Sequence, residues 1–89
     1  MVFLLYWSVS KDKLKEAIER FRETKGAMPA GVQLLARWHH VAERKGITIV
    51  QSDDASAVGR GALEWNDLMD IEVRQVLDDK EAASVLFAG

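Results

Sequence analysis

The eight residues Val2–Val9 constrain the fold of this chain more than any other segment. They are aliphatic, aromatic or β-branched almost throughout, and they do not alternate between apolar and polar side chains. A strand that exposes one face alternates in this way, whereas a strand buried on both faces is a continuous apolar run. The segment is therefore predicted to be the central strand of a sheet that is covered on both sides.

Two later segments carry the pattern of amphipathic helices. Apolar residues recur at i, i+3, i+4 and i+7 along residues 14–21, with Ser10 as the expected N-cap and Gly26 as the expected end. The same spacing extends along residues 58–69, and the Ser-Asp-Asp run that begins at Ser52 can cap that helix. Each helix is predicted to pack one apolar side against the sheet.

The remaining segments complete a familiar order of elements. Residues 32–41 and 46–51 are predicted to form a hairpin, residues 70–77 a last strand, and residues 79–89 a tail with a short helix. The order strand, helix, strand, strand, helix, strand gives an α+β, ferredoxin-like sandwich. It has a four-stranded antiparallel sheet with two helices on one face. We expect residues 1–89 to form a single domain of this kind.

The hairpin register decides which side chains share a face of the sheet. With a four-residue turn, His39 faces Thr48 and Arg37 faces Val50, so these four residues share one face because side chains alternate along a strand. Trp38 lies on the other face. We predict that Trp38 faces the helices and that the Arg37 face is open.

An open apolar sheet face predicts a partner. Two helices cover one face only, and a large apolar surface left in water is unusual for a monomer. We expect a homodimer in which a second copy covers the open face, with the tail contacting either its own chain or the partner. The candidate pocket or interface residues on this face are Arg37, His39, Thr48, Val50, Glu72 and Arg74, together with either Tyr6 or Trp7, which are neighbours on a strand and point to opposite faces.

Composition excludes several classes of protein. The 89 residues include no cysteine, which removes disulfides and thiolate sites and suits a reducing compartment. The formal charge is −2 with acids and bases interleaved, which argues against nucleic-acid binding. No run approaches the roughly 20 apolar residues of a membrane span. A soluble, cytoplasmic protein without membrane or nucleic-acid partners is predicted.

Four pieces of the sequence together resemble a known family. The pieces are YWS at the end of the first strand, GVQLLARWH, the helix start SDDA, and ALEWNDLMDIEVRQVLDD. They are similar to the short bacterial proteins grouped as domain of unknown function 3303, over nearly the whole chain. The resemblance implies a fold like that of the dimeric α-β barrel proteins, which include cofactor-independent monooxygenases, haem-degrading enzymes and proteins without known activity. It supplies no catalytic residues, because fold alone does not select a function.

The two adjacent histidines are the first candidates for chemistry. His39 and His40 point to opposite faces of a strand, so they cannot readily chelate one metal ion, and we expect no metal site and no cofactor. His39 can act as a general base if a substrate lies beside it. The interpretation we favour is an interface or pocket-rim histidine that bonds Thr48 or a carboxylate.

Arg37, Glu72 and Arg74 are the candidates for ionic contacts. An arginine fork can hold the carboxylate or phosphate group of a ligand, but pairing with Glu72 is the commoner use. We therefore expect a homodimeric binding or accessory module. The alternative is a small cofactor-independent enzyme, monooxygenase-like or isomerase-like, with a pocket on the open sheet face near His39, Arg37 and Trp7 or Tyr6. Whether the chain is an enzyme is left open by the sequence.

Overall fold

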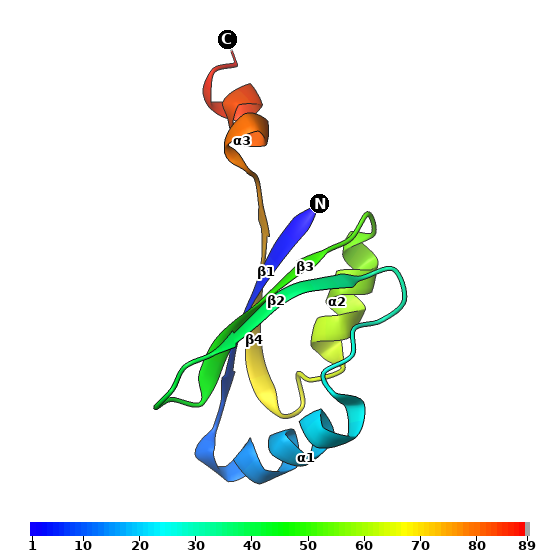
Figure 1. Ribbon diagram of the computed structural model, residues 1–89, viewed down its shortest axis with the longest axis vertical. Coiled ribbons are helices and arrows are strands. Elements are labelled where there is room, and N and C mark those ends of the chain that lie inside the picture. The colour runs from blue at the N-terminus through cyan, green and yellow to red at the C-terminus, as the bar shows by residue number, and fades with distance from the viewer. Residues whose placement is uncertain (89) are drawn as a thin grey trace.

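Strand β1 (Val2–Val9) lies inside a four-stranded antiparallel sheet in the computed structural model, which describes residues 1–88 (Figure 1). The strand order is β2-β3-β1-β4, so both edges of β1 are paired. This confirms the central position that its apolar run predicts. The other elements, in chain order, are η1 (Lys11–Lys13), α1 (Leu14–Thr24), β2 (Gln33–His39), β3 (Lys45–Gln51), α2 (Ala55–Leu63), β4 (Met69–Val76) and α3 (Asp79–Leu86).

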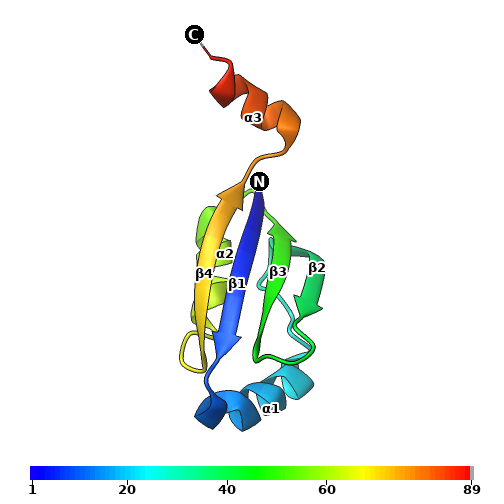
Figure 2. The same cartoon turned by 90° about the vertical axis from the view of Figure 1, so that its left-hand side faces the viewer.

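Helices α1 and α2 both contact the same face of the sheet. Under α2, the buried residues Phe3, Leu5 and Val50 pack against Val58. Near α1, Ala17 packs with Val9, at the far end of β1. Figure 2 shows α2 behind the sheet and alongside its strands, with α1 at one end. The α+β class and the β-α-β-β-α-β order expected from the sequence are confirmed, with α3 added at the end of the chain.

The helix termini follow the sequence only in part. Asp54 caps α2, and its carboxylate accepts hydrogen bonds from the backbone N–H groups of Ser56 and Ala57. The predicted cap at Ser10 is wrong, because its side chain makes no cap bond and a 3₁₀ turn precedes α1. The chain leaves α1 through left-handed backbone that ends at Gly26, with φ 65°, as expected of a helix-stopping glycine.

The hairpin has a longer loop and a different register from those predicted. His39 faces Gly46 and Arg37 faces Thr48, so the strands are offset by two residues from the expected pairing. Five residues, 40–44, form the connection. A bulge between Leu34 and Ala36 adds a further irregularity. A shift of two residues leaves each side chain on its own face, because side chains alternate with a period of two.

The prediction that Arg37, His39, Thr48 and Val50 lie on the open face is wrong. Val50 is 0% exposed and packs under α2. The other three line a cavity between the sheet and the helices. Trp38, predicted to face the core, is instead 65% exposed on the opposite face. Alternation shows which residues share a face, but both faces of this hairpin carry apolar side chains, so the pattern does not show which one the helices cover.

The open face is apolar in the middle and charged along β4. Tyr6 pairs with Glu72 and Leu4 with Arg74 in the β1–β4 register, which places Tyr6, Glu72 and Arg74 on the open face. Tyr6 rather than Trp7 therefore faces the open side, and the prediction that Glu72 and Arg74 share a face with Arg37 is wrong. Arg74 bonds Glu72 at 3.3 Å. The apolar residues on this face, all incompletely buried, include Val2, Leu4, Tyr6, Ala36, Trp38, Ile47, Ile49 and Val76.

Helix α3 projects beyond the end of the sheet (Figures 1 and 2). A capping box at its start pairs Asp78 with Glu81, so local bonds hold its first turn. Phe87, just past the helix, is 81% exposed. The radius of gyration is 14.6 Å, against about 12 Å for a compact chain of this length.

Gly89 of the predicted tail lies outside the described residues. None of the helices within residues 1–88 is both long and apolar enough to cross a membrane.

Candidate functional site

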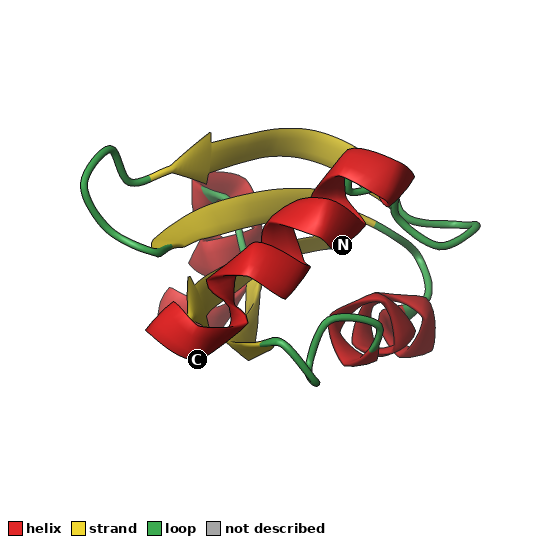
Figure 3. Cartoon of the chain, turned by 90° about the horizontal axis from the view of Figure 1, so that it is seen from below, coloured by secondary structure: helices red, strands yellow, loops and turns green. Residues whose placement is uncertain are grey.

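A cavity of about 230 Å³ lies between α1 and the sheet. Figures 1 and 3 show its origin: α1 runs across one end of the sheet at a steep angle to α2, which runs beside the strands. Only Ala17 of the α1 stripe is buried, while Ile18 and Phe21 are 48% and 39% exposed and line the cavity. The apolar stripe of α1 therefore faces a hollow that is partly open to solvent.

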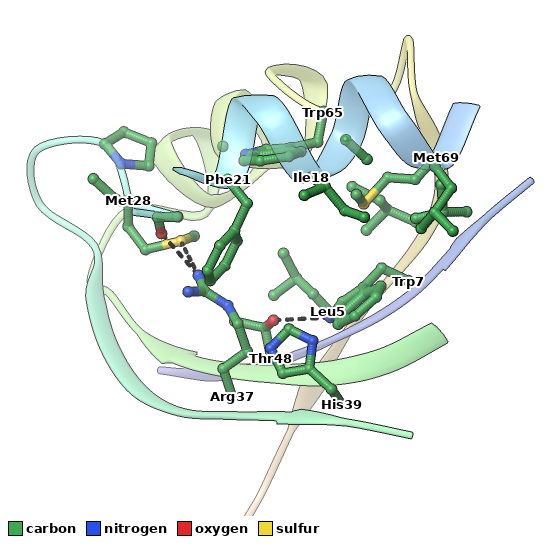
Figure 4. Close-up of a pocket in the computed structure, with 18 residues that line it drawn as sticks. Leu5, Trp7, Ile18, Phe21, Met28, Arg37, His39, Thr48, Trp65 and Met69 are labelled. Atoms are coloured by element: carbon green, nitrogen blue, oxygen red, sulfur yellow. Dashed lines mark hydrogen bonds between the residues drawn. The ribbon is translucent and has the colours of Figure 1, made fainter. Parts of the chain in front are cut away.

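The walls of the cavity are mainly apolar (Figure 4). Three aromatic side chains contribute, namely Trp7 from β1, Phe21 from α1 and Trp65 from the turn after α2. Leu5, Ile71 and Met28 add aliphatic and thioether surface. Small-molecule sites are commonly of this type, with apolar walls and a few polar groups that fix the orientation of the ligand.

Arg37 supplies the only guanidinium among the described residues that line the cavity. Its Nη2 donates to the backbone oxygen of Gly26 at 2.8 Å, and its Cζ lies 5.4 Å from the centre of the Phe21 ring. No carboxylate in residues 1–88 pairs with it, so the predicted pairing with Glu72 is present for Arg74 and is wrong for Arg37 within the chain. Partial burial lowers the pKa of Arg37 from its ordinary value because water is removed from the charged form.

Thr48 and His39 lie beside Arg37 in the cavity wall (Figure 4). The Trp7 Nε1 group donates to the Thr48 hydroxyl at 3.1 Å, which leaves the Thr48 hydroxyl proton available to an acceptor. The His39 ring packs edge-on against Trp7 and Phe21, with centroid separations of 5.1 and 5.9 Å. The expected bond from His39 to Thr48 or a carboxylate is not among the hydrogen bonds of residues 1–88.

Two glycines make room for these side chains. A Cβ atom at Gly46 would collide with the Trp7 ring and with the backbone oxygen of Trp38. A Cβ atom at Gly26 would collide with the Arg37 guanidinium, in a left-handed conformation that already disfavours other residues. The positions of Trp7 and Arg37 therefore depend on the absence of a side chain at Gly46 and Gly26.

A salt bridge anchors α1 over the cavity. Arg20 contacts both carboxylate oxygens of Asp67, at 2.7 and 2.8 Å, and donates to the backbone oxygen of Glu64. The same guanidinium lies 5.6 Å from the centre of the Trp65 ring. The hydrogen bond from Arg20 lowers the pKa of the Asp67 carboxyl. These contacts connect α1 to the turn between α2 and β4, which also supplies Trp65 to the wall.

The family described as Domain of unknown function (DUF3303) matches residues 1–89. The chain belongs to this family. No curated protein matches it. The resemblance found in the sequence is thus confirmed, and the description of the DUF3303 family assigns no reaction, ligand or partner to the cavity.

The cavity of this DUF3303 chain brings together half of the predicted site residues. Trp7, Arg37, His39 and Thr48 line it, whereas Val50 is part of the filled core. The others predicted, Tyr6, Glu72 and Arg74, lie on the opposite face of the sheet. Within the described part of the chain, no group of three or more His, Asp or Glu side chains is placed to hold a metal ion.

Sequence reasoning missed the contribution of Phe21, Met28 and Trp65 to the cavity. Phe21 belongs to the predicted apolar stripe of α1, which the sequence assigns to the core. Trp65 is predicted to lie within the second helix, but α2 ends at Leu63 and β4 begins at Met69. No sequence signal identifies them as cavity residues, because apolar side chains that line a cavity have the same spacing as those that fill a core.

Proposed function

We propose that this chain is a homodimeric binding module whose cavity beneath α1 holds a small, largely apolar molecule. The observation that carries the proposal is the cavity itself, with apolar walls on most sides and polar groups confined to the edge formed by Arg37, His39 and Thr48. A hollow of this kind leaves apolar side chains without partners, and a ligand would supply them. The absence of cysteine suits a reducing compartment, so we place the module in the cytoplasm.

Ligand binding can be tested with a thermal-shift screen of small aromatic and aliphatic compounds, because a bound ligand stabilises the folded state. Ile18→Trp is designed to fill the cavity from α1. Leu63→Trp is the matched control, since Leu63 is exposed at the end of α2 and does not line the cavity. Stabilisation of wild type and Leu63→Trp but not of Ile18→Trp supports the proposal. Equal stabilisation of all three places binding elsewhere and contradicts it.

Two unpartnered apolar surfaces support the dimer. The open sheet face exposes Trp38 and Tyr6 beside Ile47 and Ile49. The projecting segment around α3 exposes Val85, Leu86 and Phe87. Burying such surfaces between two copies is favourable at roughly 25 cal/mol per Å² of apolar area. We place the second copy on the open sheet face, with α3 reaching across to it.

The molar mass in solution at micromolar concentration tests the dimer. Light scattering should give twice the 10.0 kDa of one chain. Trp38→Asp places a charge in the proposed interface and should give monomers, while Leu63→Asp, on the exposed side of α2, should remain dimeric. A monomeric wild-type protein, or a Trp38→Asp variant that remains dimeric, counts against this assembly.

The position of His39 in the cavity wall supports a second candidate, a cofactor-independent enzyme in which His39 is a general base. A ligand found in the screen would be incubated in D₂O with wild type and with His39→Gln, and its proton NMR spectrum followed. Exchange of a ligand C–H that depends on His39 supports this candidate. A ligand that is unchanged by the wild-type protein supports the binding module.

A further inference from the structure

The polar edge of the cavity offers several donors and no acidic side chain. Arg37 carries five guanidinium N–H groups, and its bonds to the Gly26 oxygen and the Met28 sulfur both come from Nη2, which leaves Nη1 and Nε free. The Thr48 hydroxyl accepts from Trp7 and keeps its own proton to donate. No aspartate or glutamate among residues 1–88 lines the cavity. The free groups of this edge therefore match an acceptor with negative charge.

The charge on Arg37 lacks the carboxylate partner that four of the other five arginines have. Arg20, Arg22, Arg60 and Arg74 each pair with a carboxylate in the described part of the chain. Arg37 is half-buried, and its charge faces a backbone carbonyl, a thioether and an aromatic ring instead. A partly desolvated cation without an anion is unfavourable, and an anion entering the cavity would relieve that cost.

The size of the cavity limits the rest of the ligand. An apolar cavity of about 150 Å³ accepts benzene, so the cavity of about 230 Å³ has room for one ring and a short acidic group. The rings of Trp7, Phe21 and Trp65 offer surfaces against which a ring can pack edge-on or offset. A nucleotide or a long lipid chain is too large to be enclosed.

From these observations we infer that the cavity binds a small monocarboxylate with an apolar body the size of one ring, oriented with its carboxylate on Arg37 and Thr48. The inference rests on the proposed function, since it names the ligand class of the same cavity. The guanidinium fork can donate to both carboxylate oxygens, or to one oxygen while the Thr48 hydroxyl donates to the other. The apolar body then occupies the space between Ile18 of α1 and Trp7 of β1.

The test compares three probes of nearly equal shape, namely phenylacetate, 2-phenylethanol and phenethylammonium. Their dissociation constants are measured by titration calorimetry with the full chain. Phenylacetate should bind at least about tenfold more tightly than the neutral alcohol, because hydrogen bonds to charged groups are the stronger ones. The cation should bind most weakly of the three.

Variants of Arg37 separate the anion site from a general effect of charge. Arg37→Leu should remove the preference for phenylacetate over the alcohol, and Arg37→Lys should restore part of it, because lysine keeps the charge without the fork. Arg74→Leu removes the same charge from the open face and should leave the preference unchanged. Circular dichroism of each variant verifies that it is folded, and Arg37→Lys carries the test if Arg37→Leu is not.

The outcomes distinguish failure of the carboxylate inference from failure of the proposed binding function. Equal affinity for phenylacetate and the alcohol, unchanged by Arg37→Leu, overturns the carboxylate inference and leaves the apolar binding site in place. Equal loss of preference in Arg37→Leu and Arg74→Leu also overturns it. No binding of any probe, together with a negative compound screen, overturns both the inference and the proposed function.

Discussion

The two helices that cover the sheet use it differently. Beneath α2, Phe3, Val50 and Val58 form a closed core with almost no exposure. Beneath α1, Ile18 and Phe21 stay partly exposed above a cavity. A close-packed half and a hollow half thus share one sheet, and their side chains should contribute unequally to folding. Ile18 and Phe21, which remain partly exposed at the hollow, are therefore expected to contribute less to stability and to be available for binding.

The largest expected effect is a loss of stability in the closed half. Phe3→Ala should lower the free energy of unfolding by about 3–5 kcal/mol, because it removes a buried aromatic side chain and leaves a cavity. Phe21→Ala, the same change in the hollow half, should cost much less. Urea unfolding of both variants measures the difference. Similar losses would show that α1 is packed as tightly as α2, contrary to the account.

Replacing a glycine by alanine should change stability less than Phe3→Ala, and in opposite directions in the two halves. Gly46→Ala should cost about 1–3 kcal/mol, because the added methyl group meets the Trp7 ring and a backbone oxygen. Gly59→Ala in α2 should instead raise stability by up to about 1 kcal/mol, since the new methyl group meets open space and alanine favours a helix. Thermal unfolding of the two variants gives the signs. A Gly46→Ala protein as stable as wild type would show that the Trp7 ring does not pack closely against Gly46.

The salt bridge between Arg20 and Asp67 should weaken in acid. Its effect on stability should be smaller than those of the phenylalanine and glycine substitutions. The pKa of Asp67 is lowered by Arg20, so its stabilising contribution is present above the unfolded pKa near 3.9 and is lost as the pH falls through the lower folded value. Asp67→Asn should therefore show a shallower decline of unfolding free energy below about pH 4 than wild type. Identical pH profiles would indicate that this exposed pair does not hold α1.

The contrast between the halves also explains which parts of the fold and the site can be predicted from the sequence. The run Val2–Val9 predicts a central strand correctly, but within the chain only one of its two faces is covered, and Tyr6 on the other face is 43% exposed. The hairpin faces are assigned wrongly, because Trp38 and Val50 both look like core residues and a period of two does not rank them. The cavity is not visible in the sequence, since the α1 stripe that lines it has the same spacing as a stripe that fills a core.

Assembly is a further step that the pattern predicts only in outline. The open face is expected from the count of helices, and it exists, but its residues include Leu4, Tyr6, Trp38, Ile47 and Ile49 together with the charged pair on β4. Arg37, His39 and Thr48, which the sequence places at the interface, line the cavity instead, together with Trp7. The predicted interface and the predicted site are therefore two surfaces on opposite sides of the sheet.

The three tryptophans allow the central claim to be measured in one experiment. Trp7 and Trp65 line the cavity, and Trp38 lies on the open face. Their indole N–H signals are recorded in a ¹⁵N–¹H correlation spectrum, assigned with single tryptophan-to-phenylalanine variants, while phenylacetate is added. The signals of Trp7 and Trp65 should shift with a common dissociation constant, and the signal of Trp38 should not shift. Movement of the Trp38 signal alone, or of none of the three, would contradict the central claim.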